Sequence, residues 1–114
     1  MSNQHLDYDV LSALQEVMED DYPLLLDTFL SDSQVRLNEL HKATDPQKLG
    51  QAAHSFKGSS SNMGATHLAH LCHQLEERVK HPPLNDIEDL VNRIDNEFAE
   101  VRRLYDDERQ RFAY

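Results

Sequence analysis

The chain has 114 residues, a formal net charge of −10 and a single cysteine, and each of these totals excludes some classes of function. The length suits one domain with its own core, so we expect a single domain over residues 1–114. The excess of Asp and Glu disfavours binding to nucleic acid or to an anionic membrane, because both need a basic face. The single cysteine, Cys72, excludes an intramolecular disulfide and a multi-cysteine zinc site. The expected partners are therefore other proteins or small molecules.

The amino terminus, MSNQHLDYDV, has neither the basic segment nor the apolar segment of a secretory signal. No apolar run approaches the roughly 18 residues of a membrane-spanning helix. Both observations predict a cytoplasmic protein.

Apolar residues recur at spacings of three and four in five segments, which predicts five helices and no strand of useful length. The first helix is expected over about residues 7–20. The second is expected over about 22–43, where Pro23 suits a first helical turn. The apolar stripe of the first helix is Leu6, Val10, Leu14, Val17 and Met18, and that of the second is Leu26, Phe29, Leu30, Leu37 and Leu40.

The third helix is expected over 46–61, because Asp45 can cap it and Pro46 can take its first position. Gly64 suits the left-handed conformation that ends a helix. The fourth helix is expected over 65–80 and stops at the His81-Pro82-Pro83 run. Its apolar stripe is Leu68, Leu71, Cys72, Leu75 and Val79.

The fifth helix is expected over 86–108, opened by Asn85 with Glu88 three residues later, a pattern that resembles a capping box. Its apolar seam could pair two chains as a coiled coil, but the favoured interpretation is that it faces helices of its own chain. Short connections favour antiparallel neighbours. The predicted fold is therefore all-α, an up-down antiparallel four-helix bundle with an additional N-terminal helix, in a monomeric protein. The seam is Ile87, Val91, Ile94, Phe98, Val101 and Tyr105.

His54 points away from the predicted core. On a helical wheel it falls roughly 150° from the centre of the buried stripe of the third helix. Gly50 lies one turn before it on the open face and Gly58 one turn after it, while Lys57 follows at three residues. Surface helix positions normally favour strong helix formers, so two glycines there leave the imidazole uncovered. The stripe itself is Leu49, Ala52, Ala53, Phe56, Ser60 and Met63.

This arrangement has two interpretations, a reactive imidazole or a surface histidine beside incidental glycines. An imidazole is a good nucleophile near neutral pH, and a phosphoryl group is a group that it could carry. A phosphoryl group in the middle of a helix would need a nearby cation, which Lys57 could supply. No acid or base partner for His54 is present in its own helix.

The run from His54 to Ala65, continuing to Leu68, Cys72 and Leu75-Glu76, closely resembles the signature of histidine-containing phosphotransfer (HPt) domains. The resemblance implies a free-standing bacterial phosphorelay protein that is a phosphocarrier and not an enzyme. His54 would accept a phosphoryl group at Nε2 from a receiver-domain aspartyl phosphate and pass it to another receiver aspartate. Lys57 would balance the phosphoryl charge, and Gly58 would leave room for the partner's active site.

The same resemblance implies partners and cofactors. The partners would be receiver domains of a hybrid sensor kinase and of a response regulator, docking on exposed apolar residues of the segments 6–18 and 22–30. The protein would need no cofactor of its own, because the receiver would supply Mg²⁺.

Other functions remain as alternatives. The chain could be an unphosphorylated helical module that sequesters a receiver, although the intact set of His54, Lys57 and Gly58 opposes this. A sensor-kinase histidine domain is disfavoured because Ser55 follows His54 and no nucleotide-binding motif is present. No carboxylate or metal constellation supports a phosphohistidine-dependent hydrolase. The fourth helix carries three histidines, but they spread over about 120° of the wheel, so a solvated face is favoured over a zinc site. These three are His67, His70 and His73.

Overall fold

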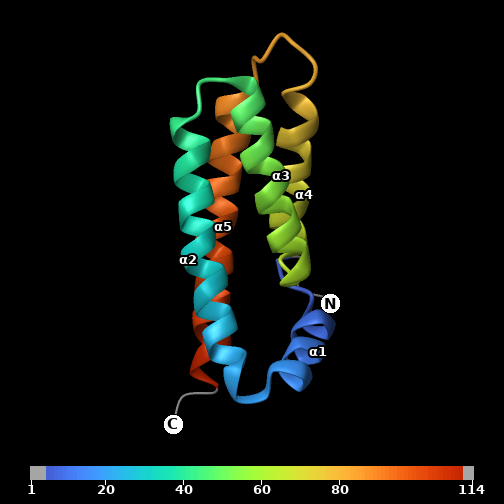
Figure 1. Cartoon of the computed structure of the whole chain (residues 1–114), viewed down its shortest axis with the longest axis vertical. Helices are drawn as coiled ribbons and strands as arrows, with labels where there is room; N and C mark the ends of the chain where they lie inside the picture. Colours follow the sequence, from blue (N-terminus) through green and yellow to red (C-terminus); the bar gives the residue numbers. More distant parts are fainter. Residues whose placement is uncertain (1–4, 112–114) are drawn as a thin grey trace.

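The computed structural model describes residues 5–111, and helices make up its regular secondary structure (Figure 1). No strand occurs among these residues. A short N-terminal helix, α1, is joined to the longer helices by a single 3-10 turn, η1. The elements are α1 (Tyr8–Met18), η1 (Glu19–Asp21), α2 (Tyr22–Lys42), α3 (Pro46–Asn62), α4 (Thr66–Arg78) and α5 (Ile87–Gln110).

Helices α2 to α5 run alternately up and down, and each connection joins antiparallel neighbours (Figure 1). The two longest helices, α2 and α5, extend past the ends of α3 and α4 at the lower end of the molecule. Helix α1 lies in the space that α3 and α4 leave there. This confirms the predicted all-α, up-down four-helix bundle, and α1 is the predicted additional N-terminal helix.

Most of the core comes from the apolar stripes predicted for α2, α3, α4 and α5, although Val79 and Ile87 are only partly buried. Leu26, Phe56 and Ile94 are fully buried, and Phe56 meets Phe98 edge to face with 6.3 Å between ring centroids. Burial of aromatic and aliphatic side chains of this size supplies most of the stability of a bundle. The α5 seam faces the bundle's own interior, so the intramolecular interpretation of that seam is confirmed.

Val17 does not belong to the core, contrary to the sequence prediction, because its side chain is 78% exposed. Leu6 and Leu11 supply the buried contacts of this segment instead. Helix α1 therefore packs through Leu11, with Leu14 and Met18 partly buried against the core, and leaves Val17 at the surface.

Helix α3 begins and ends where the sequence predicts. The Asp45 carboxylate accepts a hydrogen bond from the Gln47 amide at 3.0 Å, and Pro46 occupies the first turn.

Gly64 lies just beyond the end of the helix and adopts φ +77°, a conformation that is unfavourable for residues other than glycine. The amide of Asp7 donates to the Gly64 carbonyl at 2.7 Å, and the Tyr105 hydroxyl donates to the Met63 carbonyl at 2.5 Å. Two distant parts of the chain thus hold the turn that ends α3.

The capping box predicted at Asn85 is wrong, because α5 begins at Ile87 with Asp86 at its N-cap. Asp86 has φ −105° and ψ 8°, which is not the extended conformation that lets a cap side chain reach the first amides, and it makes no side-chain cap bond. The preceding loop is organised by Arg78, whose guanidinium donates to the carbonyls of His81 and Pro83.

Among the residues that the structure describes, no helix combines the length and the apolar character needed to cross a bilayer.

Candidate functional site

His54 lies in the middle of α3 with its side chain 67% exposed. Its neighbours Ala53 and Phe56 are fully buried, so the helix turns His54 outward as the wheel predicts. The imidazole is therefore held on a helix whose opposite face is packed in the core, while it remains open to a partner.

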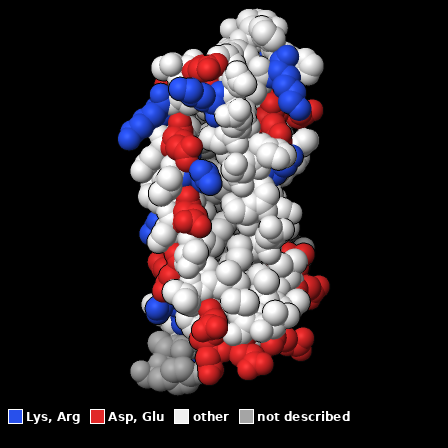
Figure 2. Space-filling view, in the orientation of Figure 1, with Lys and Arg blue, Asp and Glu red and all other residues white. Residues whose placement is uncertain are grey.

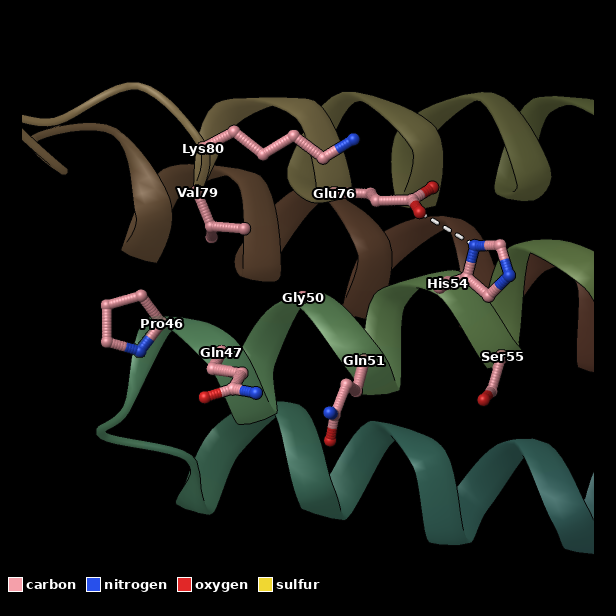
Figure 3. A pocket seen from close by; sticks show the side chains of 9 residues that line it. All are labelled: Pro46, Gln47, Gly50, Gln51, His54, Ser55, Glu76, Val79 and Lys80. Carbon is pink, nitrogen blue, oxygen red and sulfur yellow. Dashed lines mark hydrogen bonds and ion pairs between the residues drawn. The ribbon is translucent and has the colours of Figure 1, made fainter.

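Glu76 on α4 fixes the orientation of the imidazole. Its Oε2 lies 2.7 Å from Nδ1 of His54, as the dashed line in Figure 3 shows. An ionised carboxylate accepts hydrogen bonds and cannot donate them, so Nδ1 must carry the proton of this bond. In the neutral ring the lone pair then sits on Nε2, the nitrogen that points away from Glu76.

Lys57 completes the cluster by pairing with the other oxygen of the same carboxylate. Its Nζ lies 2.7 Å from Oε1 of Glu76, and its side chain is 29% exposed. Glu76 itself is only 14% exposed. The hydrogen bond from Lys57, followed by that from His54, holds the pKa of the Glu76 carboxyl below its usual range, against an opposing effect of burial.

Glu76 is the site residue that the sequence argument missed as a partner of His54. Periodicity within α3 reveals only neighbours on the same helix, whereas Glu76 lies on α4, 22 residues further along the chain. One signal was available, because Glu76 follows the buried Leu75 directly and therefore lies at the edge of the packed face of α4.

Replacing Glu76 by glutamine should lower the free energy of unfolding at neutral pH, because two charge-assisted hydrogen bonds lose their acceptor charge. A depressed folded-state pKa stabilises the fold above the unfolded value of about 4.3 and ceases to do so as the pH falls through the folded value. The difference in the free energy of unfolding between the wild type and Glu76→Gln should therefore become smaller as the pH falls. Urea unfolding at several pH values between neutral and about 3 would measure it. A difference that stays constant with pH would contradict the ion pair.

The two glycines beside His54 have different environments. A β-carbon built on Gly58 would meet no atom within 4 Å, so this position is open, as predicted. A β-carbon on Gly50 would lie 3.1 Å from Cγ2 of Val79, so Gly50 faces α4, and the prediction that it lies on the open face of α3 is wrong. The wheel gives directions around α3 but does not show where α4 crosses it. Gly50 lets the two helices approach closely.

A hollow of about 470 Å³ lies over Gly50, between α3 and the end of α4 (Figure 3). We call it the α3–α4 hollow. Pro46, Val79 and the backbone of Gly50 give it a mostly apolar surface, and His54 forms part of its wall. Glycine inside a helix costs about 1 kcal/mol relative to alanine, so the chain gives up stability where the hollow forms.

The histidines of α4 do not form a metal site. The rings of His67 and His70 stack with centroids 6.4 Å apart, and His73 turns instead toward Glu76, with Nδ1 3.9 Å from Oε1. Within residues 5–111 no group of three His, Cys, Asp or Glu side chains is placed to hold a metal ion. Cys72 is buried in the core, as predicted, and burial raises the pKa of its thiol to about 12, which keeps it protonated.

Comparison with known proteins agrees with this geometry. A model of the Hpt domain family matches residues 24–104. The phosphorelay protein LuxU of Vibrio vulnificus, in strains YJ016 and CMCP6, is 32% identical over 90 residues, covering 75% of this chain and 78% of LuxU. The crystal structure of histidine-containing phosphotransfer protein B (HptB) from Pseudomonas aeruginosa PAO1 matches with a TM-score of 0.94 and 52% identity, over 98% of this chain and all of that one. The chain therefore belongs to the Hpt domain family and is a histidine phosphotransfer protein of a multistep phosphorelay.

Proposed function

We propose that His54 is the phosphoryl carrier and that its Nε2 is the reacting atom. The observation that supports this most is the hydrogen bond between Nδ1 and Glu76, which leaves the lone pair on the exposed nitrogen. Nucleophilic catalysis requires an accessible lone pair held in a fixed direction. The exposed face of α3 provides the access, and the contact with Glu76 fixes the direction.

The transfer of the phosphoryl group requires no reactant other than His54 and the receiver's aspartyl phosphate. The Nε2 lone pair attacks the phosphorus of a receiver's aspartyl phosphate, the bond from phosphorus to the aspartyl oxygen breaks, and the aspartate leaves as a carboxylate. The ring retains its Nδ1 proton and becomes cationic, facing the Glu76 carboxylate at the distance already present. Transfer onward to a second receiver reverses each change.

In this proposal the receiver brings the aspartate and Mg²⁺, and the chain contributes a positioned acceptor and a cation. Phosphoryl transfer depends mainly on positioning and charge compensation, so a carrier can serve without catalytic machinery of its own. We accordingly assign it the role of a phosphocarrier and not of an autokinase. The donor would be a hybrid sensor kinase and the acceptor a response regulator, both acting on a monomeric carrier in the cytoplasm.

Lys57 is proposed to exchange partners during transfer. It pairs with Glu76 in the unphosphorylated protein, and a phosphoryl group on His54 would offer a second anion within reach of the same ammonium. Arrival of the phosphoryl group would place two anions around one lysine. The cationic ring beside Glu76 offsets part of that charge.

Replacing Lys57 by alanine should slow transfer and shorten the lifetime of the phosphohistidine by about 10- to 150-fold, the range expected for one charge-assisted hydrogen bond. Labelling itself should persist. Quenched-flow transfer and decay of the radiolabel would measure both effects. Lys48→Ala is the matched control, since Lys48 is exposed on the same helix and lies outside the cluster. Equal transfer rates and phosphohistidine lifetimes in the two variants would show that another cation balances the phosphoryl charge.

The proposed docking surface lies where α1 meets α2. Val17 and Leu24 are 78% and 64% exposed, and Tyr8 is partly exposed on the same two-helix segment. The η1 turn between the helices is Glu19-Asp20-Asp21, and Figure 2 shows acidic side chains gathered at this end of the molecule. An apolar surface bordered by acidic residues fits a protein partner with a basic rim.

The direct test is to incubate the protein with each receiver domain of the source organism after loading that receiver with acetyl phosphate. We expect an acid-labile, base-stable label on the protein, together with loss of the receiver's phosphate. A receiver that binds tightly but never transfers its phosphate would support the alternative, a module that sequesters receivers without being phosphorylated.

A further inference from the structure

The α3–α4 hollow lies beside the phosphotransfer site but takes no part in the chemistry described above. Its wall includes His54, and its floor is the backbone of Gly50 against the side chain of Val79. Figure 3 shows Val79 pointing from α4 toward α3, with His54 one turn further along α3. The hollow and the reacting nitrogen therefore belong to one continuous surface.

The charged groups around the hollow are already engaged. Lys80, at its upper edge, holds its ammonium 2.7 Å from Oε2 of Glu77, and Glu76 binds His54 and Lys57. What remains open to an occupant is the Val79 side chain, the Pro46 ring and the exposed backbone of Gly50, with glutamine side chains beside them. An apolar group fits this surface better than an ion does.

We propose that the α3–α4 hollow receives an apolar side chain from the receiver loop that flanks the phosphorylated aspartate, and that Val79 and Gly50 thereby help to select the receiver. The inference rests on the proposed role of His54. A protein that brings an aspartyl phosphate to Nε2 must cover the imidazole, and the imidazole is one wall of the hollow. The side chain next to the aspartate then meets either the hollow or the open space at Gly58 on the other side.

This surface is distinct from the exposed apolar residues of α1 and α2. The hollow is lined by residues of α3 and of the end of α4, whereas those exposed apolar residues lie on α1 and α2. A receiver would thus be selected both by the surface of α1 and α2 and by the hollow. The hollow contributes shape, because a β-carbon at position 50 would lie 3.1 Å from Cγ2 of Val79 and would crowd its floor.

Two variants with matched controls test the proposal. Val79→Thr keeps the shape of the side chain and makes it polar, and Val35→Thr is its control at an exposed position of α2. Gln51→Trp fills the hollow from its rim, and Gln110→Trp is its control at the end of α5. The probe is the receiver domain that labels the wild-type protein fastest, loaded with acetyl phosphate, and the transfer rate is measured against receiver concentration.

We expect Val79→Thr to raise the half-saturating receiver concentration about three- to tenfold and Gln51→Trp to raise it more, with the saturated rate of Val79→Thr within twofold of wild type. The controls should match wild type. In the wild-type protein, the amide resonances of Gly50 and Val79 should shift when that receiver binds as its beryllofluoride complex.

The inference would be overturned if the transfer rates of Val79→Thr and Gln51→Trp depended on receiver concentration as the wild-type rate does. It would also be overturned if the amide shifts followed the protein's own concentration instead of the receiver's, because a second copy of the chain would then occupy the hollow. Shifts caused only by small molecules in the buffer would also overturn it. Failure of the proposed function looks different, because no receiver would then label the wild-type protein at all.

Discussion

Replacing His54 by glutamine is expected to reduce phosphoryl labelling to background. The amide side chain fills similar space but has no ring nitrogen lone pair to attack phosphorus. The fold should survive, because the side chain is 67% exposed and lies on a helix with its own buried face. Circular dichroism would establish the helix content, and radiolabel transfer from an acetyl-phosphate-loaded receiver would establish the loss.

His73→Gln is the matched control for this experiment. His73 is also an exposed histidine, and its Nδ1 lies 3.9 Å from the same Glu76 carboxylate. It should accept label at close to the wild-type rate. If His54→Gln still took the label and His73→Gln did not, the acceptor would be on α4, and the assignment argued from the exposed Nε2 would be wrong.

Replacing Gly58 by phenylalanine is expected to slow transfer at least about 100-fold, because the reacting atoms must come to within about 3–3.5 Å of each other. A bulky side chain one turn from His54 would hold the receiver's active site away from Nε2. Gly58→Ala provides the contrast. Its methyl group would meet no atom within 4 Å, and it should stabilise the helix by about 0.5–1 kcal/mol while leaving much of the transfer rate intact.

The two substitutions at Gly58 distinguish the space that the receiver needs at this position from the effect of glycine on the stability of α3. Chemical denaturation should show Gly58→Ala more stable than wild type, and Gly58→Phe with unchanged helix content by circular dichroism. Transfer near the wild-type rate in Gly58→Phe would show that the receiver approaches from another side. The open glycine would then have no role in docking.

Local signals in the sequence predicted most of the fold. Asp45 and Pro46 start α3 and Gly64 ends the turn that follows it, because each acts through backbone groups a few residues away. The same reasoning failed at Asn85, where the conformation of the loop moved the start of α5. It also failed at Val17, whose apolar spacing does not reveal that α1 packs through Leu11, Leu14 and Met18 and leaves Val17 exposed.

The site was predictable in direction but not in its contacts. The helical wheel placed His54 outward and Gly58 in the open, since both follow from α3 alone. Glu76 and Val79 reach His54 and Gly50 from α4, and their positions depend on how closely the two helices cross. That crossing is a tertiary property. Single-helix periodicity contains no information about it.

The turn after α3 has a consequence for how the protein is made. The Met63 carbonyl is bound by the hydroxyl of Tyr105, which is close to the carboxyl end of the described chain. During synthesis on the ribosome, residues 46–64 emerge long before Tyr105 does, so the turn that ends α3 at first has only its contact with Asp7 and gains the contact with Tyr105 later. A nascent chain arrested ahead of Tyr105 should therefore expose α3 to proteases that the finished protein resists. The end of the helix that carries His54 gains its hydrogen bond from Tyr105 only after α5 has left the ribosome.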